Sequence, residues 1–334
     1  MKRLSKLSAL VLSAALTLSL AACGGSNQGT APDPSAPADH SGPYTVGICQ
    51  LVQHSAHDEA TQGFTDALNE LLPGQVTIKN QTASNDIAAC SGIVNQFIAE
   101  EVDLILANAT PALQIASAVT AEIPILGTSI TDFGAALDTD VTDNIVGGNI
   151  SGTSDLAPLD EQAAMVQEWF PDVQTIGLLY CSAEANSQHQ IEVMQSELES
   201  MGYACKRYAF TDSNDLTSVL EGAIVNCDVL YVPTDNTVAT NGSIIDNICR
   251  PAGIPVIGGE KGICANCTVA TLTITYYDIG YAAGQMAAKI LTGEADISTM
   301  PIEYASCAGM YNPEICEDLG LTPPSDAYVP IHAE

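Results

Sequence analysis

Apolar residues alternate between two patterns along most of the chain. Short runs of aliphatic and β-branched residues, such as 44–51 and 102–107, are separated by longer stretches with helical spacing, such as 58–72 and 86–99. Continuous apolar strands that alternate with helices form a parallel sheet that is covered on both faces. The pattern therefore predicts an α/β fold.

Two similar units follow one another in this pattern. The first unit is also expected to have strands at 76–81 and 123–126 and a helix at 111–120. The second unit is expected to have strands at 175–180, 203–208, 229–232, 255–258 and 269–273, and helices at 159–169, 185–201, 216–225, 238–250 and 279–292. Two such units predict two Rossmann-like lobes with parallel sheets, joined by a hinge at the crossovers 144–155 and 262–272.

The predicted lobes use separate parts of the chain. The part from residue 44 onward is long enough for two lobes of ordinary domain size. We expect an N-terminal lobe of residues 44–150 plus 270–300, a C-terminal lobe of residues 151–269, and a segment, 301–334, that crosses or packs on the lobes.

The first 22 residues have the layout of a secretory signal. Three basic residues precede the apolar run 7–20, which is too short for a permanent membrane helix. The run ends in Leu20-Ala21-Ala22-Cys23, which resembles the lipobox of bacterial lipoproteins, where the Cys23 thiol would be lipidated. An ordinary signal peptide is the alternative. We expect export, a lipid anchor on the outer face of the cytoplasmic membrane, and a flexible linker at 24–43.

The charge of the chain is strongly negative. It has 9 Lys and Arg against 40 Asp and Glu, a formal net charge of −31, which becomes −34 (6 minus 40) without the three basic residues of the signal. Such a surface repels nucleic acid and anionic lipid headgroups, so neither is expected as a partner. Because 46% of the residues are hydrophobic, the chain is globular despite its charge.

The 11 cysteines leave ten after Cys23, an even number that in an exported chain suggests disulfides. Three lie in or beside apolar strands, where cysteine acts as a small buried hydrophobe: Cys49, Cys181 and Cys227. Cys264 and Cys267 form a lone C-x-x-C, for which a loop disulfide or plain thiols are favoured over zinc or redox chemistry. Cys307 and Cys316 are a second candidate bridge.

Polar residues gather in the loops that follow the predicted strands. In facing open parallel sheets, the ligand lies at these strand ends, in the cleft between the lobes. Backbone N–H groups and hydroxyls of the Thr110 and Thr131 loops suit a carboxylate, and Asp132, Glu184 or Asp235 suits an ammonium group. Helix caps and turns are the structural alternative for these residues. The candidate binding residues are Gln53, His54, Thr110, Thr131, Asp132, Thr153, Asp155, Glu184, Asn186, Ser187, Asp235 and Asn236.

The sequence has none of the common catalytic or cofactor motifs. G-x-S-x-G, the Walker loop, G-x-G-x-x-G after the first strand and H-E-x-x-H do not occur, so neither a catalytic residue nor a cofactor is expected. His54 and His57 with Asp58 have a spacing that a metal could use. A helix cap at Asp58 and one histidine in the cleft are favoured, so no metal is predicted.

Several of these loops match a known family in order and spacing. The matching stretches are Gly47–His54, Gly63-Phe64, Ala109–Ala112, Thr131-Asp132, Gly152–Asp155, Glu184–Ser187, Val232–Thr237 and Tyr276–Gly280. Across 44–305 the chain resembles the type I periplasmic-binding-protein-like ABC substrate-binding lipoproteins related to tryptophan- and tyrosine-binding proteins. The resemblance implies lobes that close on a solute by hinge motion, delivery to separate permease and ATPase subunits, no enzymatic activity, and an aromatic or other apolar amino acid as ligand.

The chain departs from the family pattern at two places. Phe133 stands where the family commonly has Pro, and His57-Asp58 stands where it commonly has Leu-Asp. Phe133, Tyr180 or Tyr276 could form an aromatic wall for the ligand or belong to the core. Two alternatives stay open: a solute sensor of the same fold, and a sugar or nucleoside binder, against which the absence of Arg from the strand-end loops counts.

Overall fold

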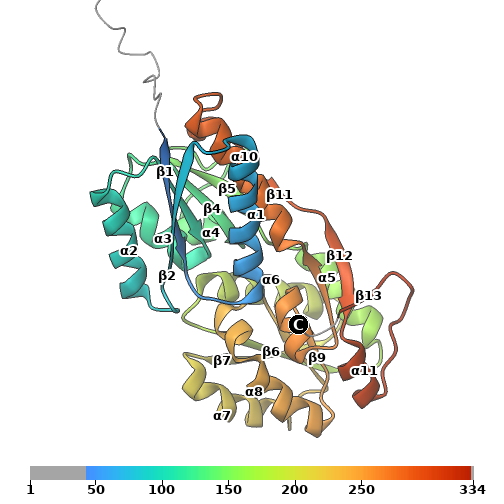
Figure 1. Cartoon of the computed structure of the whole chain (residues 1–334). Helices are drawn as coiled ribbons and strands as arrows, with labels where there is room; N and C mark the ends of the chain where they lie inside the picture. The colour runs from blue at the N-terminus through green and yellow to red at the C-terminus, as the bar shows by residue number, and fades with distance from the viewer. Residues whose placement is uncertain (1–42, 332–334) are drawn as a thin grey trace, which may run out of the picture. The chain divides into compact units, whose positions relative to one another are not determined.

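The computed structural model describes residues 43–331. The predicted signal, Cys23 and nearly all of the linker lie outside this range. Two sheets with helices on both faces make up the described part (Figure 1), which confirms the predicted α/β class. Within residues 43–331, no helix is both long and apolar enough to span a bilayer.

The first sheet is entirely parallel, with strand order β11-β5-β4-β3-β1-β2. Alternate residues of a strand point to opposite faces, and β1 shows this: Val46 and Ile48 pack against one set of helices and Cys49 against the other. The strands are β1 (Tyr44–Gln50), β2 (Val76–Thr82), β3 (Leu104–Asn108), β4 (Ile125–Ile130), β5 (Ile150–Ser154) and β11 (Glu303–Tyr304).

Four helices cover the first sheet. Helices α1 (Ser55–Leu71) and α10 (Tyr276–Leu291) pack on one face, and α2 (Ile87–Ala99) and α3 (Thr110–Val119) pack on the other. The backbones of α1 and α10 approach closely because both helices have glycine at the contact. A Cβ atom on Gly63 would lie 2.1 Å from the Tyr277 carbonyl oxygen, and one on Gly280 would lie 2.0 Å from the Ala60 carbonyl oxygen.

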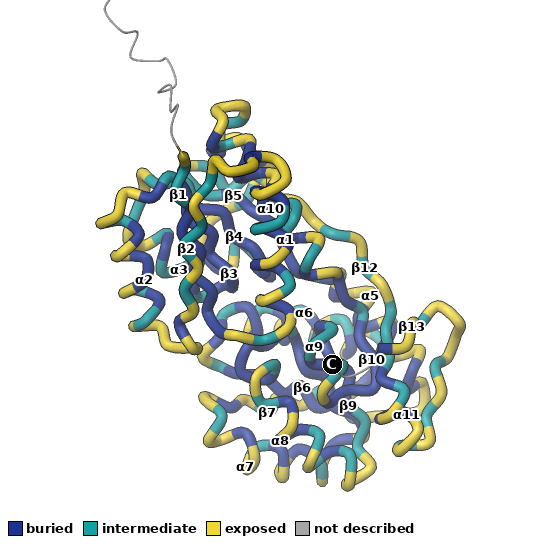
Figure 2. Tube along the Cα trace, in the orientation of Figure 1, coloured by how far each residue is buried: buried dark blue, intermediate teal, exposed yellow. Residues whose placement is uncertain are grey.

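The second sheet has the order β13-β12-β10-β9-β8-β6-β7, with β12 antiparallel to β10 and the other pairs parallel. Its central strands are buried, whereas exposed residues lie on the outer sides of helices such as α7 (Figure 2). The strands are β6 (Thr175–Cys181), β7 (Ala204–Phe210), β8 (Val229–Val232), β9 (Val256–Gly258), β10 (Ala270–Ile274), β12 (Cys307–Tyr311) and β13 (Val329–Pro330).

The helices of the second sheet also form two layers. One hydrophobic cluster joins the sheet to α5, α6 and α11, and another joins it to α7, α8 and α9. Their bounds, with the short helix α4 that follows β4, are α4 (Phe133–Leu137), α5 (Leu159–Trp169), α6 (Ala185–Ser200), α7 (Ser213–Ala223), α8 (Asn236–Ala252), α9 (Lys261–Cys267) and α11 (Pro313–Leu319).

The sheets divide the chain differently from the predicted lobe boundaries. β5 lies in the first sheet although 151–154 was expected in the C-terminal lobe, and β10 lies in the second sheet although 270–274 was expected in the N-terminal lobe. The chain therefore passes between the sheets after β5, after β10, and between β11 and β12. The sequence of β5 resembles a crossover between lobes because its buried residues have hydroxyl side chains in place of apolar ones. Ser151 donates to the Met300 carbonyl oxygen, and Thr153 donates to Thr128 Oγ1.

The cysteines within residues 43–331 are all free thiols. Neither of the two candidate bridges is formed. Cys264 and Cys267 lie on the same short helix, α9, where each thiol faces a backbone carbonyl oxygen, of Thr268 and Ile263 respectively. Cys307 lies on β12, and the Cys316 thiol in α11 faces the Val269 carbonyl.

Candidate functional site

The ends of β1 and β3 are tied to the start of α1 by buried amide side chains. Gln50 donates to Asp58 and accepts from Thr61 Oγ1, both at 2.7 Å. Asn108 donates through Nδ2 to the His57 carbonyl and to Thr61 Oγ1. Its Oδ1 is buried and accepts no hydrogen bond from any residue that the structure describes. A buried acceptor without a partner is costly, so Asn108 leaves a binding position open at this edge.

Two strained residues lie beside Asn108. Ala109, just before α3, has φ of 106°, and Ser129 in β4 has φ of 56°, where the register of β4 against β5 shifts. The Ser129 hydroxyl is buried and has no partner within residues 43–331. Non-glycine residues with positive φ concentrate at ligand sites. Thr110 is buried at the start of α3, where backbone N–H groups are free of intrahelical bonds.

Asp155 connects the strand ends of the first sheet to α10. Its carboxylate accepts from Thr131 Oγ1 at 3.2 Å and from the Tyr276 hydroxyl at 2.9 Å. Burial raises the pKa of Asp155 to about 6, although both hydrogen bonds oppose the shift. Because Asp155 directly follows β5 and Tyr276 begins α10, this cluster lies where the chain passes between the sheets.

In the second sheet, two carboxylates hold the start of α8. Glu184 accepts from both the backbone and the side chain of Asn236 and of Thr237, at 2.7–3.0 Å. Asp235 accepts from the backbone N–H groups of Cys181 and Val238, at 2.7 and 2.9 Å. Burial, with Glu184 nearby, raises the pKa of Asp235 to about 8. Both carboxylates therefore have a structural role in placing α8.

Asn186 and Ser187 lie at the start of α6, beside the same loop. Asn186 donates to the Thr234 carbonyl at 2.9 Å, and Ser187 lies against Asp235. Asn186 Oδ1 is buried, and nothing in the described part of the chain donates to it. It is the counterpart in the second sheet of the open acceptor at Asn108.

A cavity of about 370 Å³ lies between elements of the two sheets. The start of α1 provides one wall, and α8, α9 and residue Ile331 provide the other. The pKa of His54 falls to about 4 through burial, which keeps its ring neutral, and its Nε2 is buried without a partner among residues 43–331. The lining residues are Gln53, His54, Ser55, Glu59, Ala239, Thr240, Glu260, Lys261, Gly262, Ala265, Asn266 and Ile331.

The wall formed by α9 carries the charges of the cavity. Glu260 accepts from the backbone N–H groups of Gly262 and Ile263 and so caps α9. Lys261 Nζ donates to Glu59 Oε1 of α1 at 2.7 Å. Burial, then the charges of Asp155 and Glu59, raise the pKa of Glu260 to about 7. The cavity is therefore lined by two carboxylates and one ammonium group.

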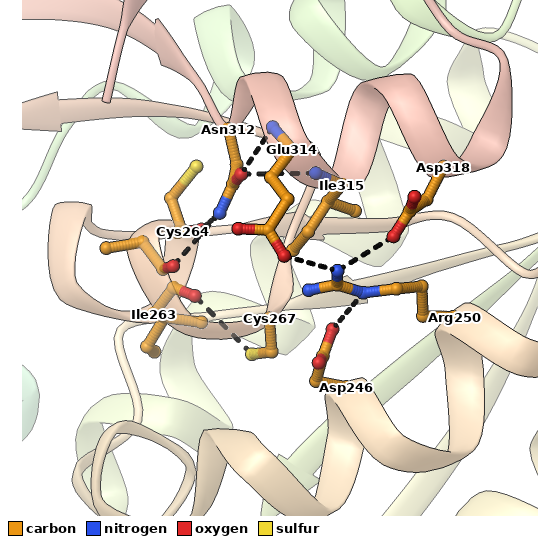
Figure 3. A network of polar contacts seen from close by, with 10 residues as sticks. Asp246, Arg250, Ile263, Cys264, Cys267, Asn312, Glu314, Ile315 and Asp318 are labelled. Atoms are coloured by element: carbon orange, nitrogen blue, oxygen red, sulfur yellow. Dashed lines mark hydrogen bonds and ion pairs between the residues drawn. The ribbon is translucent and has the colours of Figure 1, made fainter. Parts of the chain in front are cut away.

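The C-terminal segment is hydrogen-bonded to α9 and forms ion pairs with α8 (Figure 3). Asn312 caps α11 and donates through Nδ2 to the carbonyl oxygens of Cys264 and Ala265, at 3.1 and 2.9 Å. Arg250 of α8 bonds Asp246 of its own helix and two carboxylates of α11, Glu314 and Asp318. These contacts fix the position of α9 relative to α8.

The structure distributes the twelve predicted residues over several places. Gln53 and His54 line the cavity described above. Thr131 and Asp132 line a separate hollow of about 370 Å³, and Asp132 caps α4 through the Ala135 N–H. Thr153 borders a smaller hollow of about 250 Å³. The others lie in the buried networks at the strand ends: Thr110, Asp155, Glu184, Asn186, Ser187, Asp235 and Asn236.

Three charged residues of the cavity are absent from the prediction: Glu59, Glu260 and Lys261. Glu260 could have been predicted from the sequence, because it follows β9 as the other candidates follow their strands. The contact between Glu59 and Lys261 could not have been predicted, because the two residues are 202 positions apart in the sequence. In the described residues, no group of three or more His, Cys, Asp or Glu side chains is arranged to hold a metal. Phe133 and Tyr180 belong to the cores of the two sheets.

Comparisons with known proteins identify the family of the chain. A family model described as ABC transporter substrate binding protein matches residues 45–329. The tyrosine-binding protein of Clostridioides difficile is 29% identical over 303 residues, which cover 89% of this chain and 87% of that protein.

Two solved structures have the same fold. A domain from Streptococcus pneumoniae in complex with L-Trp has a TM-score of 0.81 at 27% identity, over 85% of this chain and 97% of that chain. A ligand-free, open substrate-binding protein with adhesive properties from Clostridium difficile has a TM-score of 0.68 at 32% identity, over 87% and 100%. Because the match extends over both sheets and all the strand-end loops, the chain belongs to the family of ABC transporter substrate-binding proteins.

Proposed function

We propose that this protein binds an aromatic or other apolar amino acid between its two sheets and delivers it to an ABC importer. The observation that carries the proposal is a set of buried polar atoms without hydrogen-bond partners. Of the six such side-chain atoms in the described part of the chain, four lie at the strand ends: His54 Nε2, Asn108 Oδ1, Ser129 Oγ and Asn186 Oδ1. Buried polar atoms are almost always paired in folded proteins, so a polar ligand at this place would satisfy them.

An amino acid has the groups that these atoms require. The start of α3, with Thr110, offers backbone N–H donors for a carboxylate. The open oxygens of Asn108 and Asn186 can accept hydrogen bonds from polar groups of a ligand. Of the four atoms, only His54 Nε2 belongs to a residue that lines the cavity of about 370 Å³, a volume at the small end of the range for ligand pockets.

The named relatives support the ligand class. One is called a tyrosine-binding protein, and one solved structure contains L-Trp. The proposed partners are separate permease and ATPase subunits, and the proposed location is the outer face of the cytoplasmic membrane, with a lipid on Cys23 as anchor. No catalysis is proposed, because a transporter must release its solute unchanged. The net charge of −31 argues against nucleic acid as a partner.

A thermal-shift screen of the purified protein against the twenty amino acids, with sugars and nucleosides, tests the proposal. A ligand that binds only the folded state raises the melting temperature by mass action. We expect the largest rise with tyrosine, tryptophan or phenylalanine, one molecule bound per chain, and recovery of the unchanged amino acid. A rise with a sugar or nucleoside alone would contradict the amino-acid ligand, and conversion of the solute would contradict the transport function.

A further inference from the structure

The carboxylates near the strand ends differ in what their oxygens already bind. A carboxylate can accept about four hydrogen bonds. Glu184 receives four short ones from Asn236 and Thr237, and a fifth contact comes from Asn186 at 3.4 Å. Asp235 is only 1% exposed, accepts one backbone N–H on each oxygen, and does not line the cavity. Glu184 is therefore fully occupied, and Asp235 does not reach the space where a ligand fits.

Glu260 differs from Glu184 in occupancy and from Asp235 in position. It accepts one backbone N–H on each oxygen, so about half of its acceptor positions remain open. Its side chain is 2% exposed, and it lines the cavity of about 370 Å³. It is therefore a buried carboxylate that reaches the space where a small molecule fits.

The neighbouring cation does not neutralise Glu260. Lys261 donates to Glu59 across the cavity, and none of the ion pairs within residues 43–331 includes Glu260. The groups that face Glu260 from the other elements are acidic or neutral: Glu59 on α1, Asp155 after β5, and the Tyr276 hydroxyl on α10. A buried negative charge is costly without a cation.

A second observation points to a ligand at the same place. The ring of His54 lines this cavity, and its buried Nε2 has no partner among the described residues. The same range contains no set of side chains arranged for a metal ion. The missing cation is therefore best supplied by an organic ligand with a protonated amine.

We infer that Glu260 accepts the ammonium group of the bound amino acid and so selects amino acids over their des-amino analogues. This inference rests on the proposed function. It assigns the ammonium position to the residue that caps α9 and lines the cavity, whereas Asp132, Glu184 and Asp235 do not line this cavity. The ammonium group of the ligand would then provide the positive charge that no Lys or Arg side chain within residues 43–331 provides to Glu260 in an ion pair.

The test is the affinity of Glu260→Gln for L-tyrosine and for 3-(4-hydroxyphenyl)propanoate, which lacks only the amino group. Glutamine has a similar size, and its one side-chain oxygen can still accept one of the two N–H groups at the start of α9. We expect calorimetry to show a loss of about 30-fold or more for L-tyrosine, because the ammonium loses its charged partner, and less than about threefold for the analogue. L-Tryptophan and 3-(indol-3-yl)propanoate form a second matched pair.

Two variants serve as controls, and a third tests a competing assignment. Asp86→Asn changes a cap of the same kind on α2, away from the cavity, and should leave both affinities unchanged. Glu260→Asp keeps the charge and the cap but moves the carboxylate, so it should reduce the preference for L-tyrosine less than Gln does. Lys261→Gln tests the competing assignment, because Lys261 lines the same cavity, and the inference expects it to lower the L-tyrosine affinity less than Glu260→Gln does.

The outcomes separate this inference from the proposed function. If a folded Glu260→Gln binds L-tyrosine like the wild type, Glu260 does not hold the ammonium group, while amino-acid binding itself stands. If Gln at this position prevents folding, an unchanged preference in Glu260→Asp overturns the inference. A large loss of L-tyrosine affinity in Lys261→Gln, with none in Glu260→Gln, would overturn the inference. The charged contact would then join Lys261 to the carboxylate of the ligand. A wild-type protein that binds no amino acid refutes the proposed function.

Discussion

Lys261 Nζ lies 2.7 Å from Glu59 Oε1 and so joins helix α9 of the second sheet to helix α1 of the first, across the mouth of the cavity. The two side chains are 33% and 25% exposed, which screens their attraction. Gly262 follows Lys261, and a Cβ atom there would lie 2.8 Å from Ser55 Oγ. The two helices are therefore in close contact at this point.

The first prediction concerns this ion pair as a contact that holds the two sheets together. Glu59→Gln should speed ligand dissociation by about fivefold or less, since a partly exposed, screened pair contributes about 1 kcal/mol or less. A double-mutant cycle with Lys261→Gln, measured by stopped-flow dissociation at low and high salt, should give a coupling that falls with salt. A coupling of zero at low salt would mean that the two residues act independently.

The second prediction concerns the pH dependence of stability without ligand. Burial raises the pKa of Asp155 to about 6, that of Glu260 to about 7 and that of Asp235 to about 8. Between the ordinary carboxyl pKa and these values, the folded protein holds protons that the unfolded chain releases, so stability falls as pH rises. We expect the ligand-free protein to melt several degrees lower at pH 8 than at pH 5.5.

Variants identify the carboxyl groups responsible for the fall of stability with rising pH. Glu260→Gln has no carboxyl proton to lose, so it should flatten the decline of stability below about pH 7, whereas Asp86→Asn, at an exposed cap, should not. Urea unfolding at each pH gives the free energies. A wild-type stability that rises steadily from pH 5.5 to pH 8 would contradict the raised pKa values.

The regular elements were predictable because hydrophobic pattern alone determines them. The helix Leu159–Trp169 and the strand Val229–Val232 were predicted with the bounds that the structure shows. β5 and α9 were missed for identifiable reasons. The strand β5 buries serine and threonine hydroxyls that bond carbonyl and hydroxyl oxygens, so it lacks an apolar pattern. The helix α9 has only seven residues, including a glycine and two cysteines.

The roles of the polar residues at the strand ends were harder to predict than the positions of the strand ends. A carboxylate that follows a strand and precedes a helix fits both a ligand contact and a helix cap. The sequence cannot separate the two roles, because they differ only in which donors lie around the oxygens. Asp235 and Glu260 both follow strands, but only Glu260 lines the cavity. The twelve predicted residues stay predictions until binding is measured on variants.

The third prediction therefore changes the role expected for Asp235. Asp235→Ala removes the acceptor of the Cys181 and Val238 N–H groups, both buried. Loss of a helix cap and of a second buried hydrogen bond should cost about 2–4 kcal/mol of unfolding free energy. Urea unfolding measures this cost directly. A stability equal to that of the wild type, with lost ligand affinity, would instead return Asp235 to the binding site.

The fourth prediction concerns Cys23, which lies outside the described residues. If the lipobox resemblance holds, mass spectrometry of the N-terminal peptide should show a diacylglyceryl group on Cys23, and the protein should sediment with membranes. Cys23→Ala should remove the lipid and move the protein out of the membrane fraction without changing its ligand affinity. A processed but unlipidated Cys23 would favour the ordinary signal peptide.

The fifth prediction tests the close approach of α1 and α10. Gly280→Ala places a methyl group 2.0 Å from the Ala60 carbonyl oxygen, a backbone atom that cannot move without shifting a helix. Overpacking of this kind costs about 1–3 kcal/mol, and we expect the upper end. Gly92→Ala in α2 is the matched control, because its Cβ meets no heavy atom within 4 Å. That change should stabilise by about 0.5–1 kcal/mol, and equal effects of the two substitutions would contradict the tight packing of α1 on α10.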